Sequence, residues 1–312
     1  MIQSPSFCEL LGNTIVSWSS DSTAEPAELQ PLTSLTRLTS LCVRDGTNLG
    51  DMTELRHLHH LDTLTLYKVS ALASKVPNFR NLQYLSLSDC SDEIWDFSSC
   101  SGLVNLRISS LGDIVKQIVL PSGPEVMLQD LSVEMMPQDT HDYVMANISQ
   151  ATHLTEVTFM SAYPSNFRDG EWPLHLPNLY KLQLDGLSCD LPSAVTSCPN
   201  LRHFAVTDHE QATLPLWLSS MTQLACLRIH SGKLEQFPEQ ILQLSQLRCL
   251  LVSNETNFVL PRILLCCAYW PNLTMLHIDA GQDNVPLESQ LKMLQLEILI
   301  KLHNVGCEVR FD

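Results

Sequence analysis

The sequence has few of the features that mark nucleic-acid-binding, membrane or secreted proteins. It carries 18 Lys and Arg against 34 Asp and Glu, which gives a formal net charge of −16. Binding to a phosphate backbone needs clustered cations, so this balance disfavours nucleic acid as a partner. The longest apolar run, residues 263–270, is far too short to cross a bilayer. Because the N-terminal segment also lacks the pattern of an export signal, we expect a cytoplasmic protein that binds no membrane.

Disulfide frameworks and catalytic motifs are missing as well. The 11 cysteines include no CxxC pair and no regular spacing, which favours a reduced compartment over a disulfide scaffold. The sequence has no glycine-rich phosphate loop, no GxSxG elbow and no HExxH motif. The three histidines of residues 57–60 do not have a spacing that would place three rings around one metal. We therefore predict no catalytic residue, no cofactor and no resident metal, and not an enzyme.

One apolar spacing, Leu-x-x-Leu-x-Leu, recurs along most of the chain. Its eleven copies begin at Leu38, Leu61, Leu82, Leu103, Leu128, Leu154, Leu179, Leu201, Leu224, Leu247 and Leu273. All the core positions hold Leu, Ile, Val or Phe, and each copy ends in the alternation of an extended strand. A unit of this length cannot bury its apolar face alone. The pattern therefore predicts stacked units, each with one short strand and one return segment.

The return segments add a second signal, since several contain an apolar residue followed by proline, as at Leu191-Pro192, Leu214-Pro215 and Phe237-Pro238. The repeats resemble those of intracellular plant or algal leucine-rich-repeat proteins, including disease-resistance receptors and F-box subunits. The resemblance implies an α/β horseshoe solenoid of about eleven to twelve repeats, with a parallel concave sheet and short helices or 3-10 turns on the convex side. Where that family usually has Asn or Cys in the turn, only Cys90 matches, so we expect irregular turns.

The ends of the chain fall outside the clear repeats, which occupy residues 35–279. A stacked array exposes apolar surface at both ends and needs caps. We expect an N-terminal cap and polar loop over residues 1–34, with a degenerate strand at 15–18. A C-terminal cap is expected over 280–312, with a helix at 287–302 and a closing strand at 305–311. Because a solenoid grows without a central core, we expect one domain and a monomer.

The residues that flank the core positions point away from the core, and two groups of them stand out. An acidic group consists of Asp130, Glu134 and Glu156, for which a solvated face is favoured over a site for a basic partner. The C-terminal patch has a weakly apolar centre and a polar rim, and comprises Cys226, Cys249, Leu251 and Met275 with His203, Arg228, His230 and His277. Interfaces usually have such a centre and rim, so the patch is the predicted partner-binding site.

Cys226 and Cys249 occupy the same outward position on consecutive repeats, and His203 and Met275 extend the row. Such a row could attract a soft ion such as Cu(I), or its two thiols could oxidise reversibly. The favoured interpretation is the floor of a docking patch, where a thiol behaves as a small hydrophobe. We therefore predict a non-catalytic protein-interaction scaffold that binds a protein partner on its concave face. The resemblance also implies an alternative, the ligand-recognition part of a ubiquitin-ligase adaptor or intracellular immune receptor.

Overall fold

The structure is a computed structural model, and the described part of the chain divides into two compact units. The units are Met1–Tyr163 and Pro164–Asp312. The structure describes residues 16–19, 36–44, 52–68, 79, 81–90, 94–109, 117–121, 126–136, 148, 151–165, 175–187, 191–207, 213–231, 239–253, 270–279 and 308–311.

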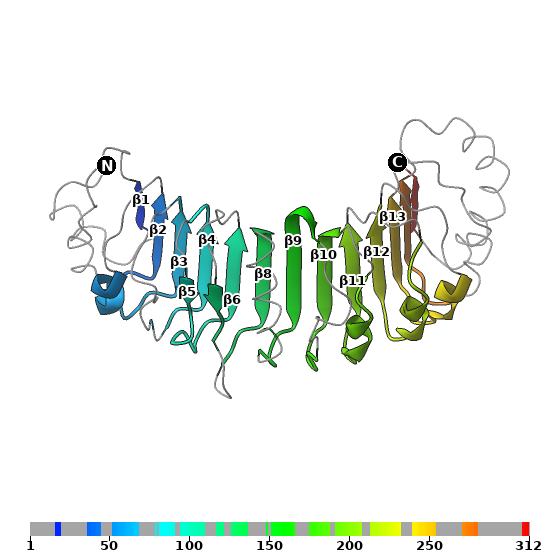
Figure 1. Ribbon diagram of the computed structural model, residues 1–312, viewed down its shortest axis with the longest axis horizontal. Coiled ribbons are helices and arrows are strands. Elements are labelled where there is room, and N and C mark those ends of the chain that lie inside the picture. The colour runs from blue at the N-terminus through cyan, green and yellow to red at the C-terminus, as the bar shows by residue number, and fades with distance from the viewer. Residues whose placement is uncertain are drawn as a thin grey trace. The chain divides into compact units, whose positions relative to one another are not determined.

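The first unit contains a parallel sheet formed by one strand from each successive repeat (Figure 1). The strands pair in the order β1 (Val16–Ser19), β2 (Ser40–Arg44), β3 (Thr63–Tyr67), β4 (Tyr84–Ser88), β6 (Asn105–Ser109), β8 (Asp130–Met136) and β9 (Glu156–Ser165). A 3-10 helix, η1 (Met52–His57), precedes β3. Two further strands, β5 (Ile94–Asp96) and β7 (Gln117–Val119), pair as a separate small parallel sheet.

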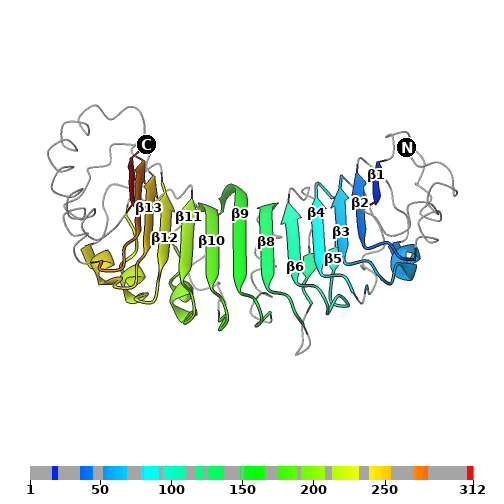
Figure 2. The ribbon, with the colours of Figure 1, turned by 180° about the vertical axis from the view of Figure 1, so that it is seen from behind.

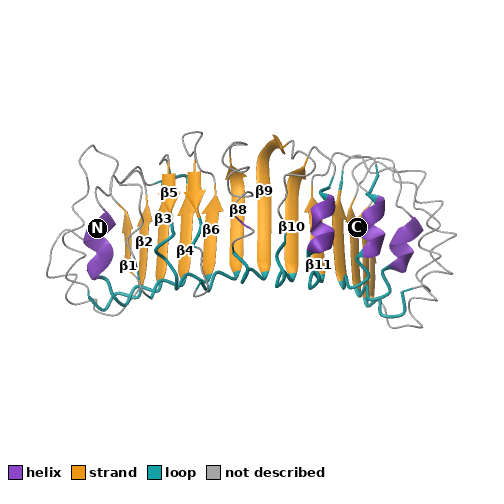
Figure 3. Cartoon of the chain, turned by 60° about the horizontal axis from the view of Figure 1, so that its bottom comes forward, coloured by secondary structure: helices purple, strands orange, loops and turns teal. Residues whose placement is uncertain are grey.

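The second unit repeats the same plan (Figure 2). Its parallel strands are β10 (Lys181–Leu187), β11 (His203–Thr207), β12 (Cys226–His230), β13 (Cys249–Ser253), β14 (Met275–Asp279) and β15 (Glu308–Phe311). Between them lie the 3-10 helices η2 (Ser193–Ser197), η3 (Leu216–Ser220) and η4 (Glu239–Gln243), each of which contacts the next (Figure 3). Each unit is thus a parallel β-solenoid with 3-10 turns, as the repeat pattern predicts.

The alternation within each strand explains why this sequence folds in this way. In β3, β11 and β13 the two core residues are buried and the three residues around them are half-buried. The first leucine of a repeat is held by a tight turn, in which its N–H donates to the carbonyl three residues earlier. Leu61, Leu201 and Leu224 bond in this way to Leu58, Cys198 and Met221 at 3.0, 3.3 and 2.9 Å. The same turn recurs before most described strands, so each strand enters the sheet in the same register.

The turns after the strands are described in only a few repeats. The Cys90 thiol is buried and donates to the carbonyls of Leu66 and Ser88, at 3.6 and 3.4 Å. This is the contact expected of the one residue that fits the family pattern. Lys68 and Asp89 have a φ of 53° just after their strands, a left-handed conformation that few non-glycine residues adopt. A further irregularity is a register shift between Glu134 and Met136 in the pairing of β8 with β9.

Strands lie at both predicted ends of the array. β1 (Val16–Ser19) falls close to the degenerate strand expected at 15–18, and β15 (Glu308–Phe311) lies within the closing strand expected at 305–311. The helix expected at 287–302 lies outside the described residues. The boundaries of the two caps therefore stay predictions.

Candidate partner-binding surface

The strand register of the second unit aligns four residues of the C-terminal patch. His203, Cys226, Cys249 and Met275 are successive register partners along β11, β12, β13 and β14. Neighbouring strands lie about 4.8 Å apart, so these side chains form one line on the same face of the sheet. All four are half-buried. The line that the repeat spacing predicts is therefore present.

Direct contacts connect the members of this line with each other and with one unpredicted residue. The Sγ atom of Cys249 lies 3.7 Å from Sδ of Met275. At the other end, Nε2 of His203 lies 3.0 Å from the hydroxyl of Tyr180, and the two ring centroids are 4.9 Å apart. Tyr180 is 48% exposed and precedes β10 directly. An aromatic ring with a free edge thus borders the predicted patch.

The thiols of the chain differ widely in acidity. A hydrogen bond from Cys249 is the main cause that lowers the pKa of Cys226 from 9.0 to about 6, against the opposing effect of burial. A hydrogen bond with His203, its charge and that of Arg228 act in the same direction. By contrast, burial raises the pKa of the Cys100 thiol to about 11 and also raises that of Cys198. Cys226 is therefore a thiolate near neutral pH, whereas the buried thiols stay protonated.

A cavity of about 280 Å³ lies beside this line, over the second halves of the strands. Its walls come from adjacent strands and are formed by Thr207, Arg228, Ile229, His230, Leu251, Val252, Ser253 and His277. Arg228, Leu251 and His277 are register partners, and Arg228 is exposed while the other two are half-buried. The hydroxyl oxygen of Thr207 is buried and has no hydrogen-bond partner among the described residues. The cavity thus combines an apolar wall with donors on its rim.

The eight predicted residues divide evenly between the two features. Arg228, His230, Leu251 and His277 line the cavity, and the remaining four form the adjoining line. Sequence reasoning did not single out Thr207 and Ser253. Both stand at the outward position that ends a strand, as His230 does, so the repeat pattern could have found them.

Within the described ranges, no three or more His, Cys, Asp and Glu side chains are grouped as a metal site would require. No described helix has the length and apolar character needed to span a membrane.

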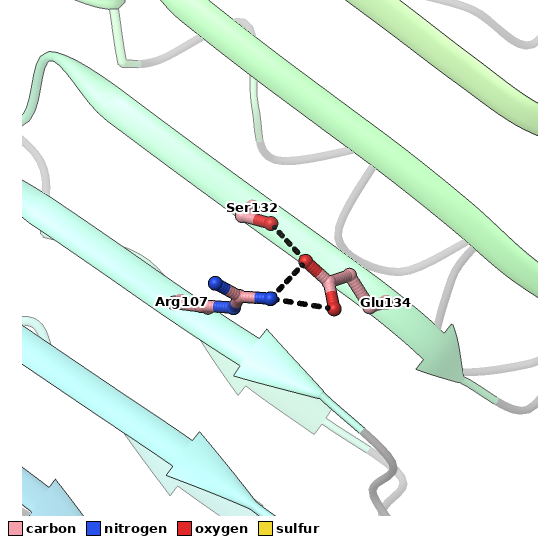
Figure 4. Close-up of polar contacts among 3 residues, drawn as sticks. All are labelled: Arg107, Ser132 and Glu134. Atoms are coloured by element: carbon pink, nitrogen blue, oxygen red, sulfur yellow. Dashed lines mark hydrogen bonds and ion pairs between the residues drawn. The ribbon is translucent and has the colours of Figure 1, made fainter.

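The acidic group of the first unit is engaged by its neighbours on the sheet. Nη2 of Arg107 lies 3.0 Å from Oε1 of Glu134, and the Ser132 hydroxyl donates to the same carboxylate oxygen at 2.9 Å (Figure 4). Asn105 donates to Asp130 at 3.2 Å. Glu134 and Asp130 therefore have partners within the sheet. The interpretation of this group as a solvated face stays a prediction.

Comparisons with known proteins give a likeness of fold only. No protein-family model and no curated protein matches this chain. Among solved structures, an internalin of Listeria monocytogenes is similar with 19% identity, 89% of this chain and 70% of that chain covered, and a TM-score of 0.48. A leucine-rich-repeat protein of Leptospira interrogans has 16% identity, 98% coverage of both chains and a TM-score of 0.36. The Drosophila Toll–Spätzle complex has 14% identity over 90% of this chain but only 46% of that chain, with a TM-score of 0.46. These structures do not single out the plant or algal proteins that the repeats resemble.

Proposed function

We propose that the chain is a non-catalytic protein-interaction scaffold whose partner binds the outward face of the second unit. The observation that carries this proposal is the cavity between Arg228, His230 and His277, with Leu251 in its wall. A small apolar centre within a rim of donors is the usual anatomy of a protein interface. The adjoining Cys249 and Met275 extend the apolar area beyond the cavity.

The size of the cavity fits one side chain of a protein partner. Its volume is about 280 Å³. It is large enough to hold one anchoring side chain, and such anchors carry much of the energy of protein interfaces.

The charges on the rim define the chemistry of that partner. The chain has a formal net charge of −16, yet the residues that line the cavity include one guanidinium, two imidazoles and no carboxylate. A carboxylate can accept paired hydrogen bonds from a guanidinium, and complementary charge also speeds association. We therefore expect a partner segment that carries an acidic residue next to an apolar one.

The alternative role, as the recognition part of a ubiquitin-ligase adaptor or immune receptor, would use the same surface. The two roles differ in the protein that carries the bound segment and in the other proteins with which the chain associates. We propose a monomer acting in the cytoplasm in either case.

The test is selection from a displayed peptide library, followed by affinity measurement with variants. Leu251→Asp and Arg228→Glu alter the apolar wall and the cationic rim, and Ser86→Asp on β4 is a matched change on the same sheet face in the first unit. We expect acidic–apolar peptides to be enriched, and both cavity variants to lose binding while Ser86→Asp retains it. Equal binding by all four proteins would exclude this surface. Capture of native partners by the same proteins would then separate a free scaffold from a ligase or receptor assembly.

A further inference from the structure

We propose that Cys226, Cys249 and Met275 form a binding site for a soft monovalent metal ion, Cu(I), on the outward face of strands β12 to β14. These three residues, called the sulfur row below, are consecutive register partners. The proposal goes beyond the docking function and does not depend on it. It departs from the sequence prediction of no resident metal and adopts the soft-ion alternative for this row. It concerns the sulfur atoms themselves, whereas the docking proposal rests on the adjoining cavity.

The spacing of the sulfur row suits an ion held between sulfur atoms. Sγ of Cys249 and Sδ of Met275 are 3.7 Å apart. A metal–sulfur bond of about 2.3 Å places two sulfur ligands of a trigonal ion about 4 Å from each other. Cys226 stands one strand further on the same face and hydrogen bonds with Cys249. The row thus places two sulfur atoms at about the separation of two ligands of one ion, with a third sulfur atom on the next strand of the same face.

The same geometry works against a disulfide between the two cysteines. Strand neighbours about 4.8 Å apart lie within the Cα range of disulfides. However, in-register positions of a parallel sheet send both Cβ atoms in the same direction, and a disulfide needs them about 3.8 Å apart. Neither cysteine forms a disulfide in this structure. A bridging ion separates the two sulfur atoms by about twice the length of a disulfide bond, so it relieves the constraint that strains direct closure.

The ligand set selects the kind of ion. Two thiolates and a thioether are soft ligands, which favour Cu(I) over the oxygen-seeking ions. A structural zinc site takes four Cys, His or carboxylate ligands, and the described residues include no group of even three. Cu(I) is satisfied with fewer ligands, and a thioether completes its shell here. The ion therefore fits this row better than zinc does.

The protonation states agree with this assignment. Cu(I) binds the deprotonated form of a cysteine, so both thiols of the row bind as thiolates. His203 also hydrogen bonds with Cys226 and acts as a positioning residue, outside the ligand set. On binding, Cu(I) forms bonds to the three sulfur atoms, and any proton still on the two thiols passes to solvent. No electron is transferred and no co-reactant is needed.

The experiment is an anaerobic titration of the full chain with Cu(I) against the chromophoric chelator bicinchoninate. Cys226→Ser, Cys249→Ser and Met275→Leu each remove one proposed ligand. Cys42→Ser is the matched control, because Cys42 is a half-buried cysteine on β2 that forms no disulfide and whose register partners are Ser17 and Thr65. We expect one chelator-resistant equivalent of Cu(I) to be lost in both cysteine variants. The affinity for Cu(I) should fall about tenfold in Met275→Leu and stay unchanged in Cys42→Ser.

Two further measurements keep the result decisive. Far-ultraviolet circular dichroism of each metal-free variant checks the fold, since all three side chains are half-buried on the outward face. X-ray absorption at the copper edge should show sulfur ligands only, with one fewer in Met275→Leu. An equal loss in Cys42→Ser, or full retention of Cu(I) by the Cys226→Ser/Cys249→Ser double variant, would overturn the site and indicate binding by cysteines in general.

Discussion

Cys226 and Cys249 are register partners on adjacent parallel strands, and a hydrogen bond from Cys249 lowers the pKa of the Cys226 thiol to about 6. The repeat places them together because both occupy the first outward position of their strands. His203 and Arg228 add positive charge on the same side. The low pKa of Cys226 thus results from side chains on three neighbouring strands.

The first prediction concerns the pH dependence of Cys226 alkylation. Below about pH 6 the thiol is protonated and slow, and above it the thiolate reacts, so the rate with iodoacetamide should rise through a midpoint near pH 6. Replacing the hydrogen-bond donor in Cys249→Ala should move the midpoint to higher pH. Peptide-level mass spectrometry separates Cys226 from the buried Cys100, whose pKa of about 11 predicts no reaction at neutral pH. A Cys226 midpoint near 9 would contradict the geometry.

The second prediction uses two adjacent leucines of β13. Leu250 is 3% exposed in the core, whereas Leu251 is half-buried on the outward face. Leu250→Ala should lower the free energy of unfolding by about 2–5 kcal/mol, because it leaves a cavity in the core. Leu251→Ala should cost less than about 1 kcal/mol, since the outward face loses little buried area. Urea denaturation of both variants measures the difference, and equal losses would mean that the strand is inverted.

Sequence periodicity could predict the core and the register because both depend only on residue spacing. Leu227 and Leu250 are register partners, as are Cys226 and Cys249, because the members of each pair occupy the same position of the repeat motif. The predicted patch followed from this register alone. The division of the patch into a sulfur row and a cavity could not be predicted in this way. The depth of the surface there depends on how side chains of four strands pack together.

Other contacts could not be derived from the pattern. The strands β5 and β7 have only three residues each, too few to show an alternation, although Trp95 and Ile118 within them are buried. Tyr180 precedes its strand, and its contact with His203 depends on the rotamers of the two side chains. The pairing of Arg107 with Glu134 could have been anticipated, because the partners stand diagonally on neighbouring strands.

The third prediction is that this ion pair contributes little to stability. The side chain of Arg107 is 53% exposed and that of Glu134 is 16% exposed, so solvent screens the interaction. A double-mutant cycle with Arg107→Ala and Glu134→Ala should give a coupling free energy below about 1 kcal/mol. The coupling should also fall as salt is raised from low to physiological concentration. A larger and salt-independent coupling would indicate a buried pair and a structural role for the acidic group.

The last prediction concerns the Thr207 hydroxyl, which is buried at the cavity and has no hydrogen-bond partner among the described residues. Leaving such a group unsatisfied costs about 1–3 kcal/mol, and an apolar group of the same shape avoids this cost. Thr207→Val should therefore leave the free energy of unfolding unchanged or raise it. If the hydroxyl is kept for a partner's polar group, the same variant should bind the selected acidic–apolar peptide more weakly. Thr65→Val on β3 is the matched control, half-buried on the outward face of the first unit. Unchanged peptide affinity in Thr207→Val would remove this hydroxyl from the proposed interface, and a marked loss of stability would show that it is satisfied within the fold.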